Sequence, residues 1–114
     1  MNTTHILDLF LDNQDEAFSE AVRAYENKDF SRAHAAFATL AKENDPQAQI
    51  NLAMMLRDGQ GAERDLVAAH MWLELAAHSG DEIAAMELKK LQKQMTPTQL
   101  DQAARRAWEW RVAA

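Results

Sequence analysis

An internal period of 36 residues runs through the middle of this 114-residue chain. The residues that agree across the offset are Asp29 and Asp65, Ala33 and Ala69, His34 and His70, Ala41 and Ala77, Asp45 and Asp81, and Ala48 and Ala84. A period of this length is typical of arrays in which helix pairs stack and bury their apolar faces against one another. The repeat therefore predicts an all-α fold, a right-handed superhelical array of antiparallel helix pairs with five or six helices (an α-solenoid).

Start signals mark the expected helices. Aspartates precede four helical stretches, at Asp29, Asp45, Asp65 and Asp81, where a carboxylate can accept hydrogen bonds from the free N–H groups of the first turn. Pro46 follows Asp45, and Thr96 to Gln99 forms a capping box with proline at the first helical position. Gly59 and Gly61 are expected to form the reversal after the third helix, because glycine tolerates positive φ angles.

The apolar spacing also predicts which side chains are buried. Trp72 is expected to be the largest side chain of the core. The last helix is expected to turn an inner side toward the repeat, formed by Leu100, Ala104, Ala107, Trp108 and Arg111. Trp110 lies about 200° around the helix from Trp108, so only one of the two rings can pack inward. We expect Trp108 to pack and Trp110 to be partly exposed or to cover another edge.

The chain is expected to form one domain, residues 1–114. Its expected parts are an N-terminal cap segment (1–14), a first helix pair (15–44), a central repeat (45–80) and a closing helix pair (81–114). The cap segment carries an apolar cluster: Ile6, Leu7, Leu9, Phe10 and Leu11. Two interpretations stay open for it, a cap packed on the first pair and a helix for docking or self-association.

The central unit resembles a known repeat. The residues that carry the resemblance to the Sel-1-like repeat are Ala48, Leu52, Gly59, Gly61, Asp65, Ala69, Trp72, Ala76, Ala77 and Gly80. The turn DGQG at residues 58–61 is its most specific part. Ala53, Leu56 and Ala62 stand where the family usually has Gly, Tyr and Val, and each replacement is small or apolar.

The flanking segments are similar to related proteins. Residues 81–110 are similar to the closing segment of many bacterial members of the Sel-1-like family, and residues 15–44 resemble the plainer tetratricopeptide repeat, with the shorter turn ENKD. The resemblance implies a bacterial scaffold or adaptor that binds other proteins. It brings no catalytic residues with it.

Composition excludes several classes of function. The net charge of −6 argues against general nucleic-acid binding, because an acidic domain lacks the counterion release that drives it. Residues 1–45 hold nine acidic and four basic residues, whereas residues 82–114 hold four acidic and six basic ones. There is no cysteine, no basic N-terminal leader and no apolar run long enough for a membrane span. We therefore expect a cytoplasmic protein without membrane insertion.

No pattern typical of catalysis is present. The four histidines include no HExxH motif, and His34 and His70 are equivalent positions of the repeat. No serine lies in a Gly-x-Ser-x-Gly elbow, and DGQG lacks the Lys-Ser/Thr of a phosphate-binding loop. The sequence predicts a non-enzymatic protein with no cofactor and no metal site.

The expected binding site is the concave groove lined by the first helix of each pair. Its residues are Ile50, Met54 and Arg57 from the central unit, Met86, Lys90 and Lys93 from the closing pair, and Glu16, Arg23 and Glu26 from the first pair, with Trp110 as a further partner contact. An apolar floor beside a basic side suits a peptide or protein segment with apolar and acidic residues. The function expected from it is that of a small adaptor or regulator.

Three alternatives stay open. A terminal helix of the chain could fill the groove. The protein could instead be an acidic antagonist, of the immunity-protein type, that masks a basic surface of an enzyme or toxin through Asp15, Glu16 and Glu20. It could also be a self-assembling unit, a homo-oligomer with contacts through Ile6, Leu9 and Phe10.

Overall fold

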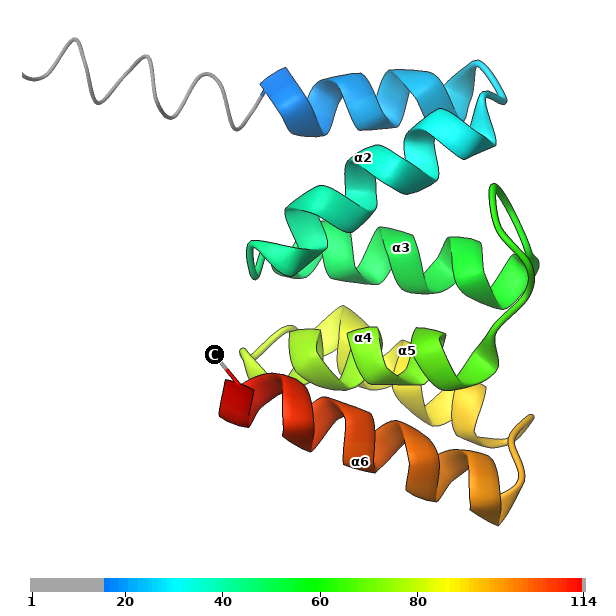
Figure 1. The fold of residues 1–114 in the computed structure, drawn as a ribbon, viewed down its shortest axis with the longest axis vertical. Coiled ribbons are helices and arrows are strands. Elements are labelled where there is room, and N and C mark those ends of the chain that lie inside the picture. Colours follow the sequence, from blue (N-terminus) through cyan, green and yellow to red (C-terminus); the bar gives the residue numbers. More distant parts are fainter. Residues whose placement is uncertain (1–15, 114) are drawn as a thin grey trace, which may run out of the picture.

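The computed structural model describes residues 16–113, and in this part of the chain helices alternate with short connections (Figure 1). A first helix covers residues 16–26 and is followed by α2 (Phe30–Lys42), α3 (Pro46–Asp58), α4 (Leu66–His78), α5 (Glu82–Gln92) and α6 (Pro97–Ala113). Residues 16–113 contain no strand. The all-α, tetratricopeptide-like solenoid predicted from the repeat is confirmed.

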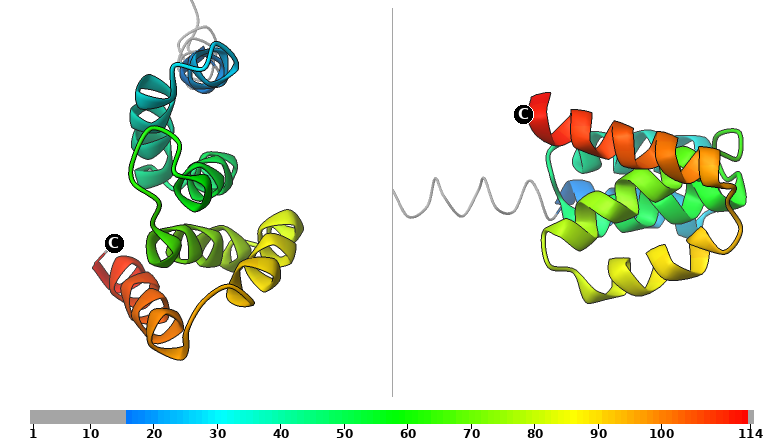
Figure 2. Two further views of the ribbon diagram at one scale, coloured as in Figure 1. Left: turned by 90° about the vertical axis from the view of Figure 1, so that its right-hand side faces the viewer. Right: turned by 90° about the horizontal axis from the view of Figure 1, so that it is seen from below.

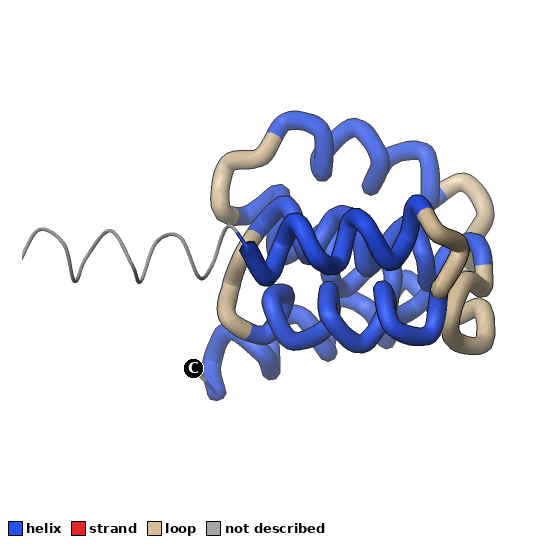
Figure 3. The backbone as a smooth tube through the Cα atoms, turned by 90° about the horizontal axis from the view of Figure 1, so that it is seen from above, coloured by secondary structure: helices blue, strands red, loops and turns tan. Residues whose placement is uncertain are grey.

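The helices form two columns. Figure 2 (left) shows the first helix, α3 and α5 on one side of the molecule and α2, α4 and α6 on the other. The connecting turns gather at the two ends of the helices (Figure 3). α3 packs against α2 and α4, and α4 packs in addition against both α5 and α6. α4 is therefore the helix on which the second half of the molecule is assembled.

The predicted start signals are confirmed. Asp45 Oδ1 accepts hydrogen bonds from the backbone N–H groups of Gln47 (2.9 Å) and Ala48 (3.2 Å). The other three aspartates cap α2, α4 and α5 in the same way. At α6, Thr96 Oγ1 accepts from the Gln99 N–H at 3.1 Å, while Gln99 Oε1 accepts from the Thr96 N–H at 2.9 Å. These bonds satisfy donors that a helix start leaves free.

The loop between α3 and α4 lies directly against α2. Gly59 and Gly61 have φ angles of +69° and +78°, as expected for this reversal. The structure adds a second requirement at Gly61. A Cβ atom there would lie 2.2 Å from the carbonyl oxygen of Phe30 and 2.9 Å from Cβ of His34. Gly61 is therefore needed for close approach as well as for its backbone angle.

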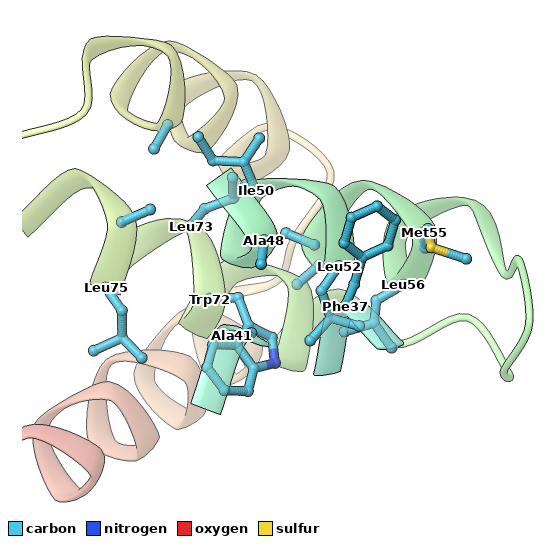
Figure 4. Packing of buried hydrophobic residues seen from close by; sticks show 14 of the residues in the cluster. Phe37, Ala41, Ala48, Ile50, Leu52, Met55, Leu56, Trp72, Leu73 and Leu75 are labelled. Carbon is cyan, nitrogen blue, oxygen red and sulfur yellow. The ribbon is translucent and has the colours of Figure 1, made fainter. Parts of the chain in front are cut away.

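The core runs through the interior of the array. Figure 4 shows side chains from α2, α3 and α4 meeting there, among them Phe37, Leu52 and Leu73. Trp72 is 6% exposed and belongs to this cluster, as predicted. The many alanines on the facing helices allow the backbones to approach closely, as dense packing requires.

The expected orientation of α6 is wrong. Ala103 and Ala107 are fully buried, and the ring of Trp110 lies 5.1 Å from that of Trp72. Trp108 is 59% exposed, and Ala104 is exposed as well. Helix α6 has two stripes of residues that could pack against α4, and both contain alanines. The stripe that packs on α4 is the one whose tryptophan meets Trp72, so the helix is turned by about one residue from the expectation.

Arg111, which was expected on the inner side of α6, is exposed. Leu100 and Ala107 belong to both stripes. Leu100 is partly buried, and Ala107 is fully buried.

Candidate functional site

A pocket of about 260 Å³ lies between the first helix and α3, above α2. Its lining residues are Val22, Tyr25, Glu26, Phe37, Asn51, Met54 and Met55. Phe37 and Met55 are almost completely buried and form the apolar floor. Charged and amide groups lie at the edge. An apolar hollow with a few polar groups is the usual form of a site that receives an apolar group of a partner.

Tyr25 forms a fixed part of the pocket rim. Its hydroxyl group donates a hydrogen bond to Gln60 Oε1 at 3.1 Å, and its ring lies 5.2 Å from that of Phe30. Gln60 belongs to the loop between α3 and α4. The bond therefore links the first helix to the loop and holds the tyrosine ring, which is still 38% exposed, at the mouth of the pocket.

Ion pairs connect α3 with α5 next to the pocket. Arg57 donates hydrogen bonds to both carboxylate oxygens of Asp58, at 2.9 and 3.0 Å, and its Nη1 lies 3.6 Å from Glu87 Oε2. Lys90 Nζ lies 3.4 Å from the other oxygen of Glu87. The bonds from Arg57 lower the pKa of Asp58 below its ordinary value, so this pair stays ionised at neutral pH. The carboxylates offset the basic side expected for the groove.

The structure brings together only some of the expected site residues. Met54 lines the pocket, and Arg57 lies beside it in the α3–α5 ion pairs. Lys90 joins the same ion pairs, whereas Lys93 is exposed at the end of α5. Met86 is 57% exposed on α5 and does not line the pocket.

Two of the expected contacts belong elsewhere. Ile50 is only 8% exposed, so it contributes to the core and not to an open groove floor. Trp110 packs on Trp72, and α6 lies in the other column of helices (Figure 2). It lines a separate hollow of about 280 Å³ with Gln49, Leu75 and Arg111, among others. Trp110 therefore does not share a site with Met54.

The first helix contributes more to the pocket than the sequence indicated. Glu26 lines it as expected, but Arg23 lines a different hollow, with Glu20 and Arg32 among others. Val22 and Tyr25 are not among the groove residues expected from the sequence, yet they line the pocket. The short turn ENKD ends the first helix close to Tyr25. It is the sequence signal that could have placed this tyrosine at the rim of the pocket.

A buried polar cluster lies between α4 and α5. His70 is 4% exposed, its Nε2 lies 3.3 Å from Gln92 Nε2, and its Nδ1 lies 3.8 Å from Glu74 Oε2. Burial lowers the pKa of His70 and raises that of Glu74, although Arg111 and His78 act in the opposite direction on the glutamate. These shifts favour the neutral forms of both groups.

His70 and Glu74 do not line the pocket under Met54. Among residues 16–113 no group of three or more His, Asp or Glu side chains could hold a metal ion. None of the helices in the described part of the chain has the length and hydropathy needed to cross a membrane.

The comparison with protein families agrees with this geometry. Residues 46–81 match the family model of the Sel1 repeat. The chain contains a Sel1 repeat. The matched segment comprises α3, its glycine loop and α4. Helix α3 supplies one wall of the pocket, and α3 and α4 together supply many of the buried core residues. Sel1 repeats mediate protein–protein interaction and are typically non-enzymatic. A comparison with curated proteins gave no match.

Proposed function

We propose that residues 1–114 form one helical repeat domain that acts as a small adaptor or regulator and binds a protein segment in the groove along the first helix, α3 and α5. The observation that carries this proposal is the pocket of about 260 Å³ between Val22 and Met54, with its buried apolar floor and polar rim. The Sel1 repeat supports it, because such repeats bind other proteins. No step of catalysis is part of the proposal.

The partner's chemistry follows from the charges around the groove. The three acidic side chains Glu26, Asp58 and Glu87 equal in number the three expected cations of the groove. Two of these cations, Arg57 and Lys90, are already paired with carboxylates. The groove is therefore close to neutral, and an acidic segment has no advantage over a neutral one. Recognition depends on a large apolar side chain of the partner that enters the pocket, where burial of apolar surface supplies most of the affinity.

Flexible methionine side chains suit this role. Met54 is partly buried at the pocket wall, and an unbranched thioether can adjust to side chains of different shape. Tyr25 at the rim offers a ring for contact and a hydroxyl group that is already oriented by Gln60.

Selection from a displayed peptide library on the full chain tests the proposal. We expect enriched peptides to share a large apolar residue. They should bind the Met54→Glu variant at least tenfold more weakly than the parent, which corresponds to a loss of about 1.4 kcal/mol of binding free energy. Val112→Glu is the matched control, because this apolar side chain is 62% exposed on α6, in the column of helices away from the groove (Figure 2). Circular dichroism verifies that both variants are folded. Equal binding to parent and Met54→Glu would contradict the proposal, as would equal losses in the two variants.

A further inference from the structure

The pocket at Met54 carries charge of one sign only. Glu26 is the only one of its lining residues that is charged at neutral pH, and none of the lining residues is basic. This glutamate is exposed, and no lysine, arginine or histidine among residues 16–113 lies within ion-pair distance of it. An unpaired carboxylate at the edge of an apolar hollow is therefore available to a cation of the partner.

The basic side chains of the neighbouring segments do not occupy this position. Arg57, on the α3 side of the groove, is already held by two carboxylates, one from α3 and one from α5. Arg23, three residues before Glu26, lines a different hollow. Lys28, in the turn after the first helix, is exposed and does not line the pocket. The pocket thus keeps the negative charge of its glutamate.

Tyr25 at the pocket rim also favours a cation. It precedes Glu26 in the chain, and both residues line the pocket. The ring is held in place by the hydrogen bond to Gln60 and by Phe30, and it is still 38% exposed. A lysine or arginine side chain that reaches the glutamate can therefore lie against this ring, and the ring quadrupole attracts a cation above its face.

We propose that the partner segment carries a lysine or arginine next to the large apolar residue that fills the pocket, and that this cation pairs with Glu26. The proposal rests on the proposed function, because it assigns a second contact in the same groove. The apolar residue packs on the floor formed by Phe37 and Met55. The basic residue lays its apolar stem across the rim and keeps its charged end at the carboxylate, partly in water.

An acidic partner segment, which the sequence led us to expect, is disfavoured at this pocket. Its carboxylates would meet Glu26, and like charges at an interface disfavour association. The lysines expected to attract such a segment lie on α5 instead. Lys90 is paired with a carboxylate there, and Lys93 lies at the end of the helix. A basic residue therefore has the advantage wherever the partner contacts the pocket.

The other acidic residues expected to mask a basic surface do not line the pocket. Glu20 lines a different hollow, and Glu16 is exposed on the first helix away from the pocket lining. Asp15 lies outside the described residues. The cap segment (1–14) also lies outside them, with its apolar residues Ile6, Leu9 and Phe10. Glu20 therefore provides a matched control, an acidic side chain of the same helix outside the proposed contact.

Selection from the displayed peptide library on three full-length chains tests the contact: the parent, Glu26→Gln and Glu20→Gln. Peptides selected on the parent and on Glu20→Gln should carry lysine or arginine close to their shared apolar residue. Peptides selected on Glu26→Gln should keep the apolar residue and lose this preference. Circular dichroism verifies that each variant is folded.

Fluorescence anisotropy then measures one selected peptide and a copy in which glutamine replaces the basic residue. This replacement should weaken binding to the parent about threefold, as expected of a partly exposed ion pair, and should leave binding to Glu26→Gln unchanged. Added salt should reduce the difference between the two peptides on the parent. Met54→Gln, which makes the pocket wall polar without adding a charge, should weaken both peptides by the same factor.

Failure of this contact and failure of the groove give different results. Peptides that share the apolar residue on the parent without an excess of lysine or arginine would overturn the proposed pairing and leave the proposed function intact. A basic preference that persists on Glu26→Gln, or that disappears equally on Glu20→Gln, would overturn the pairing as well. Peptides that bind Met54→Gln as tightly as the parent would contradict the groove itself, and the proposed function would then fail together with this contact.

Discussion

The central pair α3–α4 and the closing pair α5–α6 are packed differently. α3 and α4 pack against each other and have neighbours on both sides, so most of their apolar side chains are buried. α5 and α6 both pack on α4 and diverge from each other (Figure 2, left). Apart from Tyr25, the large hydrophobic side chains exposed among the described residues lie on this closing pair: Ile83, Met86, Trp108 and Val112. A repeat unit hides its apolar surface only where a neighbour completes it.

The tryptophans give the largest expected difference between the two pairs. Trp72→Ala should lower the free energy of unfolding by about 3–5 kcal/mol, because it leaves a cavity in the core and removes the contact with Trp110. Trp108→Ala should change it by about 0.5 kcal/mol or less, since this ring is mostly in solvent. Urea unfolding followed by circular dichroism measures both. Similar losses for the two variants would show that Trp108 is buried in the folded chain.

Glycines of the α3–α4 loop allow a second, smaller comparison. Gly61→Ala should destabilise the protein by about 2–3 kcal/mol, since it adds a clash with Phe30 to the strain of a positive φ angle. Gly59→Ala has a similar φ angle, but its Cβ would meet only Arg64 at an ordinary 3.5 Å. It should cost about 1 kcal/mol, the backbone term alone. Thermal unfolding of the two variants measures the difference, and equal costs would mean that the loop does not press on α2.

The sequence predicted the central pair better than the closing one for a physical reason. The aspartate caps, Pro46 and the glycine loop are local signals, and each acts through hydrogen bonds or backbone angles of its own segment. The face of α6 that packs inward is not determined by the local sequence. It depends on whether Trp108 or Trp110 meets Trp72, and only the position of α6 on α4 decides that.

The pocket could be predicted only in part for the same reason. Met54 lines the pocket, and the repeat phase of α3 was sufficient to assign it to the groove side of that helix. Ile50 is one helical turn away and faces the interior instead. The basic side of the groove is offset by Asp58, the next residue in the chain, and by Glu87 of α5, whose position beside Arg57 the spacing alone did not show. Contacts between helices that are distant in sequence were therefore the missing information.

The equivalent histidines of the repeat, His34 and His70, permit the finest comparison. Burial lowers the pKa of both below the ordinary value of 6.5, and each keeps a buried ring nitrogen without a hydrogen bond within the described residues. Below about pH 6.5 the unfolded chain therefore binds more protons than the folded one, so stability should fall as the pH is lowered, by at most about 1.4 kcal/mol per pH unit for each proton. Glu74 acts in the opposite direction, because its pKa is raised and the folded chain takes up its proton first.

Urea unfolding between pH 4.5 and pH 8 separates the two histidines and includes the range in which Glu74 takes up its proton. His70→Gln should flatten the pH dependence more than His34→Gln, since His70 is the more buried of the two. Glu74→Gln should steepen the loss toward acid pH, because it removes the group that opposes the histidines. If His70→Gln keeps the slope of the parent, His70 has the same pKa in the folded and the unfolded chain. In that case His70 in the central pair would be as well hydrated as the exposed residues of the closing pair.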